Sequence, residues 1–199
     1  MKESFFLRSI MKDNAVLGIV IGVCPVLAVT RTGQEGLALG LVMVMVIFLG
    51  NLTVSIFKKF ATGGVKIPFF IMTAALYASI MEAYFRIYQR PLYHNLGIFL
   101  PLSAVNCLVI WRMDESALRN PPLRSALDGL GFGVGFLAAT ICVSLIRELL
   151  GKGILLGWPL LGPGFRDAPM LFFASPAGGF LILGLLVALY KKFLKGGKS

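Results

Sequence analysis

The hydrophobic pattern of this chain is a series of long apolar runs separated by short segments that are polar or rich in glycine and proline. A helix needs about 20 apolar residues to cross a bilayer at about 1.5 Å per residue. The pattern therefore predicts an all-α integral membrane protein with six transmembrane helices. The predicted spans cover residues 14–30, 36–57, 68–88, 96–111, 127–149 and 170–193.

The first and fourth spans differ from the others because they are short and interrupted. Gly22 and Pro25 break the first span, and Pro101 lies within the fourth. Each of these two spans carries one cysteine near its middle, Cys24 in the first and Cys107 in the fourth. We therefore predict broken half-helices in spans one and four.

The two halves of the chain resemble each other, which predicts a single membrane domain (1–199) built from repeat one (about 14–88) and repeat two (about 96–193). In each half a glycine-rich span follows the cysteine-bearing span, with a Gly-x-x-x-Gly pattern that begins at Gly36 in the first half and at Gly131 in the second. Three spans per half is an odd number, so the second repeat is expected to be inverted in the membrane. Interrupted segments at matching positions of inverted repeats indicate a site near the bilayer midplane.

Polar segments between the spans are predicted to be connections: a turn at residues 90–94, a loop at 114–124 and a glycine- and proline-rich loop at 151–169. Most of the 19 lysines and arginines fall on the side that carries both termini. The positive-inside rule then predicts cytoplasmic N- and C-termini.

The composition of the chain excludes other classes of protein. The chain is 57% hydrophobic and 14% charged, with a mean hydropathy of +0.85, well above the soluble norm. The net charge of +10 is scattered among loops, with no basic face that carries interleaved aromatic residues. We therefore expect membrane lipid, and no nucleic acid, as a partner.

The candidate chemistry lies in Cys24 and Cys107, which we predict to be ligands of a metal centre. Thiolates are the usual ligands of iron–sulfur clusters, which typically take four of them. This chain offers two at matching positions, so a second subunit would supply the rest. Gly22 would let the backbone approach the sulfurs, Pro25 suits the start of a half-helix, and Asn106 is the expected hydrogen-bond donor beside the ligands.

The residues alone leave an alternative open, because a lone cysteine in a membrane helix is usually a small hydrophobic packing residue. For Cys142, inside the unbroken fifth span, packing is the preferred interpretation. Two carboxylates near helix ends, Glu82 and Glu148, are candidates for an ion pathway, and Glu82 also lies four residues before Arg86 on one helix face.

Four stretches together resemble the E subunit of the Rnf (Rsx) electron-transport complex, which is related to the D subunit of the sodium-translocating NADH:quinone oxidoreductase. They are Gly-Val-Cys-Pro-Val-Leu-Ala-Val-Thr at 22–30, Val-Asn-Cys at 105–107 followed by Arg112, the glycine-rich run 127–136, and Arg-Glu-Leu-Leu-Gly-Lys-Gly at 147–153. One departure is the run 111–117, Trp-Arg-Met-Asp-Glu-Ser-Ala, where the family usually has a Gly-Arg-Ala-Glu-Ala-Phe-like sequence.

The resemblance implies six helices in an inverted repeat, a sister Rnf protein of opposite topology (the A subunit), further B, C, D and G subunits, and a location in a prokaryotic inner membrane. It also implies a two-iron, two-sulfur (2Fe-2S) cluster ligated by two cysteines from each of the two sister proteins, which here are Cys24 and Cys107. The implied activity is electron relay within an ion-translocating ferredoxin:NAD oxidoreductase, with no substrate turnover by this chain alone. The alternatives are the corresponding member of the quinone-reducing complex, a non-redox transporter built on inverted repeats, and an assembly scaffold.

Overall fold

The computed structural model describes residues 18, 20–30, 32–61, 63–97, 99–152, 154–155, 158–159 and 175–196. Within these residues the chain is helical, apart from a hairpin of two-residue strands, β1 (Ile154–Leu155) and β2 (Trp158–Pro159), in which Leu155 pairs with Trp158. Three helices are long and apolar enough to cross a membrane. A fourth span is present if the two helices Arg90–Leu96 and Phe99–Ala117, which are bent by 62° relative to each other, are counted as one. The structure is therefore that of a polytopic, helical membrane protein.

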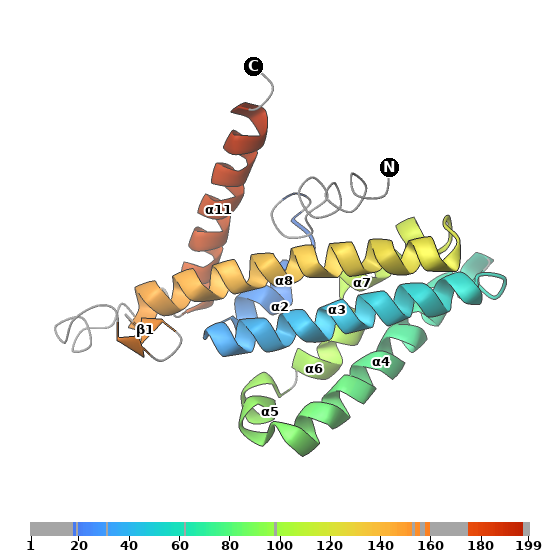
Figure 1. Cartoon of the computed structure of the whole chain (residues 1–199), viewed down its shortest axis with the longest axis horizontal. Coiled ribbons are helices and arrows are strands. Elements are labelled where there is room, and N and C mark those ends of the chain that lie inside the picture. The colour runs from blue at the N-terminus through green and yellow to red at the C-terminus, as the bar shows by residue number, and fades with distance from the viewer. Residues whose placement is uncertain are drawn as a thin grey trace.

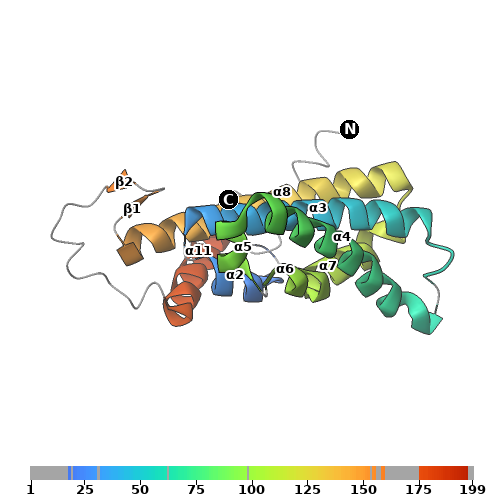
Figure 2. The ribbon, with the colours of Figure 1, turned by 90° about the horizontal axis from the view of Figure 1, so that it is seen from below.

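The centre of the fold is an antiparallel pair of long helices, α3 (Gly33–Ile56) and α8 (Pro122–Lys152), which lie side by side in Figures 1 and 2. α3 begins where the Thr32 side chain accepts a hydrogen bond from the Glu35 N–H at 3.4 Å. A threonine in this position satisfies one of the free N–H groups at a helix start. The hydrophobic core lies between these two helices and α4 (Lys66–Tyr88), and Phe70, Phe132 and Phe136 are among its fully buried side chains.

Glycines bring α3 and α8 close together. A Cβ atom on Gly36 would lie 2.5 Å from Ser144 Oγ, and one on Gly40 would lie 3.0 Å from Thr140 Oγ1. On α8, Gly129 and Gly133 lie against α3 in the same way. These glycines therefore serve close packing of the two helices.

We expect Gly133→Ala to destabilise the protein by about 1–3 kcal/mol, because an added methyl group would overpack this contact. Its Cβ would lie 2.9 Å from Val44 Cα, a backbone atom that cannot move without shifting α3. Gly184→Ala is the matched control, since no described atom lies within 4 Å of its Cβ position. Thermal unfolding in detergent measures the difference, and equal midpoints for the two variants would contradict the proposed tight contact.

The predicted breaks in spans one and four are present. In the first, the helix α2 (Val23–Val29) begins directly after Gly22. The fourth span is divided into α6 (Phe99–Leu102), a 3-10 turn (Ser103–Val105) and α7 (Cys107–Arg112). These short elements lie along one side of the α3–α8 pair (Figure 2).

Several predicted connections are instead helical. The turn expected at 90–94 is the helix α5 (Arg90–Leu96), in which Pro91 lies in the first turn, where its missing N–H is not needed. The loop expected at 114–124 is largely helical too, because a π-helix (Met113–Ala117) continues α7 and α8 already begins at Pro122. Short polar segments between apolar runs were therefore mistaken for loops.

The last helix, α11 (Pro176–Gly196), begins against α2 and α8 and then extends away from the α3–α8 pair (Figure 1). Gly179 permits this contact, since its Cβ would lie 3.0 Å from Leu27 Cδ2 and 3.2 Å from Arg147 Cζ. Most of the first predicted span before Gly22, and most of the predicted 151–169 loop, lie outside the described residues.

Candidate metal centre

Cys24 lies in the first turn of α2, directly after a reversal of the backbone. Val20 and Gly22 both have positive φ, 61° and 77°, which is the left-handed region that favours glycine. The side chain of Cys24 is exposed on the surface of this chain, while the neighbouring Pro25 is buried. The break therefore leaves the Cys24 thiol exposed in the first turn of a helix.

Cys107 has a matching position, since it is the first residue of α7. Asn106 precedes it and its Oδ1 accepts a hydrogen bond from the Leu108 N–H at 3.1 Å, which caps the helix. The same oxygen lies 3.6 Å from Cys107 Sγ. Cys107 is exposed, like Cys24, and neither forms a disulfide.

Asn106 has one feature that its capping role leaves unexplained. The residue is only 6% exposed, and its Nδ2 has no hydrogen-bond partner among the described residues. A buried donor without a partner costs about 1–3 kcal/mol. An amide donor adjoining a thiol is suited to a negatively charged sulfur ligand.

The two cysteine-bearing breaks are in contact with each other. A Cβ atom on Gly22 would lie 3.0 Å from Leu108 Cβ and 3.1 Å from its Cδ1. Gly22, two residues before Cys24, thus packs on the residue that follows Cys107. No group of three or more histidine, cysteine, aspartate or glutamate side chains gathers as a metal site within the part of the chain that is described.

Arg147, near the end of α8, holds the far end of the Cys24 half-helix. It is 1% exposed and donates hydrogen bonds to Leu27 O at 2.8 Å, to Thr30 Oγ1 at 2.9 Å and to Ser175 O at 3.3 Å. A cationic donor at the C-terminus of a helix satisfies its free carbonyl groups. Arg147 begins the stretch 147–153 that resembles the family, and its local sequence does not indicate this contact.

Arg112 holds the Cys107 half-helix to the other end of α8. It is the last residue of α7, and its Nη2 lies 2.5 Å from Asp128 Oδ1 in a buried ion pair. The guanidinium group also lies over the Phe132 ring, 4.4 Å from its centroid. Both half-helices are therefore anchored to the same helix, α8.

The other predicted residues make no described contact with Cys24 or Cys107. Glu148 is 7% exposed and accepts a hydrogen bond from the Gly33 N–H at 2.8 Å, at the start of α3. Glu82 accepts a hydrogen bond from Tyr93 Oη at 3.2 Å, and no ion pair joins it to Arg86 among the described residues. Cys142 is exposed on an unbroken stretch of α8, so it does not pack into the core of this chain.

These features define a polytopic membrane protein with two broken, cysteine-bearing helices anchored on one long helix. The chain belongs to the Rnf-Nqr family: the family model described as "Rnf-Nqr subunit, membrane protein" matches residues 3–187. This finding confirms the family expected from the sequence motifs.

Three curated relatives are similar over nearly the whole chain. The E subunit of the ion-translocating oxidoreductase complex of Cronobacter sakazakii is 36% identical, over 94% of this chain and 86% of its own length. The E subunit of the Na(+)-translocating ferredoxin:NAD(+) oxidoreductase complex of Acetobacterium woodii is 35% identical, over 92% of each chain. The E subunit of the proton-translocating ferredoxin:NAD(+) oxidoreductase complex of Clostridium ljungdahlii is 33% identical, over 96% of this chain and 88% of its own length.

Proposed function

We propose that this chain is the membrane-embedded E subunit of an ion-translocating ferredoxin:NAD oxidoreductase of the Rnf type, and that it supplies two of the four ligands of a 2Fe-2S cluster. Cys24 and Cys107 would be these ligands, and the sister A subunit would supply the other two. The B, C, D and G subunits complete the proposed complex. The names of the relatives support the complex, and the arrangement of the two cysteines supports the cluster.

The observation that carries the cluster proposal is the equivalence of the two cysteines. Each lies in the first turn of a half-helix that follows a break, each thiol is exposed on this chain, and the two breaks touch through Gly22 and Leu108. The donor set fits half of a thiolate-ligated cluster. The unpartnered Nδ2 of Asn106 is the group we propose to donate a hydrogen bond toward the sulfur ligands.

We also propose six spans arranged as two inverted three-helix repeats, with cytoplasmic termini in a prokaryotic inner membrane. The order half-helix, long helix, third helix occurs twice along the chain, as α2–α3–α4 and as α7–α8–α11. The matching helices α3 and α8 are antiparallel, since Gly36 lies by Ser144 while Gly133 lies by Val44. Antiparallel partners are what an inverted repeat requires.

In the proposed relay the protein holds the sulfur donors and limits their movement. A bound 2Fe-2S cluster supplies one-electron transfer. Arg147 and Arg112 fix the ends of the two half-helices to α8, so a shift of either half-helix would be transmitted to that helix. We propose that the charge change on electron transfer biases two arrangements of the repeats, with Glu82 and Glu148 on the ion pathway.

Iron and acid-labile sulfide analysis of the purified complex tests this function. We expect Cys107→Ala to lower the iron and acid-labile sulfide content of the complex by about two iron atoms and two sulfides per complex. One missing thiolate leaves the proposed cluster without its full ligand set. Cys142→Ala is the matched control, since Cys142 is exposed on an unbroken helix, and it should leave both contents unchanged. Unchanged iron and sulfide in an assembled Cys107→Ala complex would refute the cluster and favour a non-redox transporter or scaffold.

A further inference from the structure

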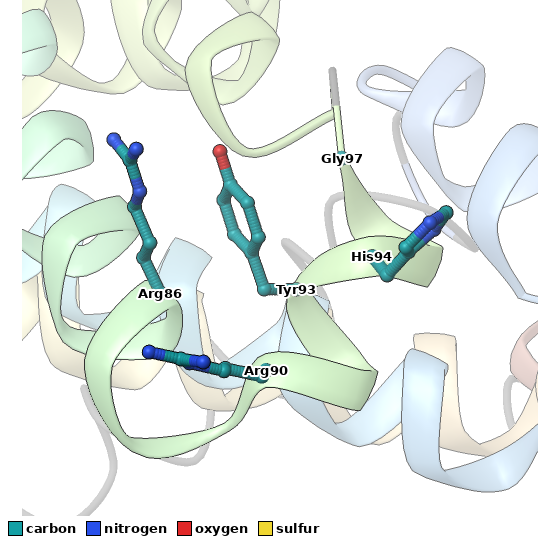
Figure 3. A pocket seen from close by; sticks show the side chains of 5 residues that line it. All are labelled: Arg86, Arg90, Tyr93, His94 and Gly97. Carbon is teal, nitrogen blue, oxygen red and sulfur yellow. The ribbon is translucent and has the colours of Figure 1, made fainter.

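A recess of about 580 Å³ opens where α4 meets α5, and it plays no part in the proposed cysteine site. Its lining residues are Arg86, Arg90, Tyr93, His94 and Gly97. Figure 3 shows Arg86 and Tyr93 pointing the same way, with Arg90 at the base and His94 on the other side of Tyr93. Two arginines and a tyrosine therefore border one small recess, whose wall is largely apolar.

Two cationic side chains border the recess, and both are accessible on the surface of this chain. Arg86 and Arg90 are both exposed, and neither belongs to an ion pair between described residues. Among the described residues, the Glu82 carboxylate contacts the lining, since it accepts the hydrogen bond from Tyr93. Two arginines thus outnumber the one carboxylate, and arginine forks match the oxygens of a phosphate group.

The recess lies at the end of a helix that is long enough to span a bilayer. α4 is one of the helices long and apolar enough to span a bilayer, and its final turns expose Tyr84, Ile87 and Tyr88 beside Arg86. Tyrosines gather at the level of the lipid head groups, where an aromatic ring meets both hydrocarbon and water. The arginines are therefore at head-group depth.

An apolar track on α4 leads to Arg86. Met72, Leu76, Ile80 and Ala83 precede it at successive spacings of four, four and three residues, which places them on the same face of the helix. All four side chains are exposed. The track from Met72 to Ala83 runs about 16 Å along the helix, which is enough for an acyl chain crossing half of a roughly 30 Å hydrocarbon core.

From this combination we propose that the recess binds the phosphate of an anionic phospholipid whose acyl chain lies along the Met72–Ala83 face of α4. Arg86 and Arg90 bind the phosphate oxygens, and Tyr93 donates a hydrogen bond to the head group when it is released from Glu82. A soluble phosphate would use the arginines alone, whereas the exposed apolar track is explained by a lipid. An anionic lipid is preferred over a zwitterionic one because the head group of a zwitterionic lipid would bring a further positive charge to a recess already bordered by two arginines.

Native mass spectrometry of the delipidated complex tests the proposal, with mixed micelles of dioleoyl phosphatidylglycerol or dioleoyl phosphatidylcholine as probes. We expect retained phosphatidylglycerol, and an affinity about tenfold lower in the double variant Arg86→Gln/Arg90→Gln. The matched control is Lys58→Gln/Lys59→Gln, which removes two exposed charges from the connection before α4 and should retain the lipid. An equal loss of phosphatidylglycerol affinity in the control variant would show that the lipid is held by diffuse charge attraction, and it would overturn the proposed binding site.

Two further measurements separate the lipid from other occupants of the recess. Inorganic phosphate or glycerol phosphate at the concentration of the lipid should not displace it, and full displacement would identify a soluble anion instead. A map of the assembled complex should show elongated density along α4 that ends at Arg86. Protein density from a neighbouring subunit over Arg90 and the α4 track would overturn the lipid assignment.

Discussion

Electron transfer across the membrane is expected to fall to background when Cys24 is replaced by alanine, while the complex still assembles. The loss follows because an alanine cannot ligate iron and the remaining three thiolates do not complete the ligand set of a 2Fe-2S cluster. Assembly should survive because the Cys24 side chain is exposed on this chain, so its removal leaves no cavity in the core. Ferredoxin-dependent NAD reduction by membrane vesicles measures the flow, and the paramagnetic signal of the reduced complex measures the cluster.

Cys24→Ser separates the loss of a ligand from the loss of side-chain volume, because a hydroxyl has nearly the same size as a thiol but is a poor ligand for this type of cluster. We expect Cys24→Ser to resemble Cys24→Ala in both measurements, whereas Cys142→Ala should resemble the unaltered protein. A non-redox transporter with the same broken helices would tolerate all three changes. Retention of the paramagnetic signal and of electron flow in the assembled Cys24→Ala complex would remove the relay role from this residue.

The second large effect is expected at Arg147, whose replacement by leucine should lower the free energy of unfolding by about 3–5 kcal/mol. The substitution removes hydrogen bonds to Leu27 O, Thr30 Oγ1 and Ser175 O and leaves these acceptors to find other partners. α2 should become the least protected of the described helices in hydrogen–deuterium exchange, because Arg147 is the side chain that holds its C-terminus. If a cluster is bound, its paramagnetic signal should broaden as the position of Cys24 becomes less uniform.

Arg119→Leu provides the matched control for Arg147→Leu. The Arg119 side chain is 70% exposed and pairs with Glu115 one turn earlier, so its loss should change stability by less than about 0.5 kcal/mol. Arg147→Lys should be intermediate, because an ammonium group retains the charge but not the planar fork that reaches three oxygens. Unaltered exchange of α2 amides in Arg147→Leu would show that other contacts fix this half-helix.

Local signals in the chain were sufficient for the three long apolar helices and for an interruption at Gly22. Apolar runs of membrane-spanning length predicted α3, α4 and α8, since the bilayer requires each spanning segment to satisfy its own backbone. Gly22 marked a real interruption because its positive φ is a property of the residue and its neighbours. The start of a half-helix near Cys24 was therefore available from Gly22 and Pro25. The break before Cys107 was not located by the sequence, because Pro101 lies within α6 and the chain departs from the α-helix at residues 103–106.

The contacts that hold these half-helices were decided by packing between distant segments. Nothing near Arg147 in the chain indicates that it reaches Thr30, 117 residues earlier, and nothing near Asp128 indicates its pairing with Arg112 across the turn into α8. Such partners depend on the close approach of α3 and α8, which places both ends of α8 beside the short helices. The spacing of apolar residues indicates which residues are excluded from water. Buried polar pairs depend on which helices are in contact, and only the folded chain determines that.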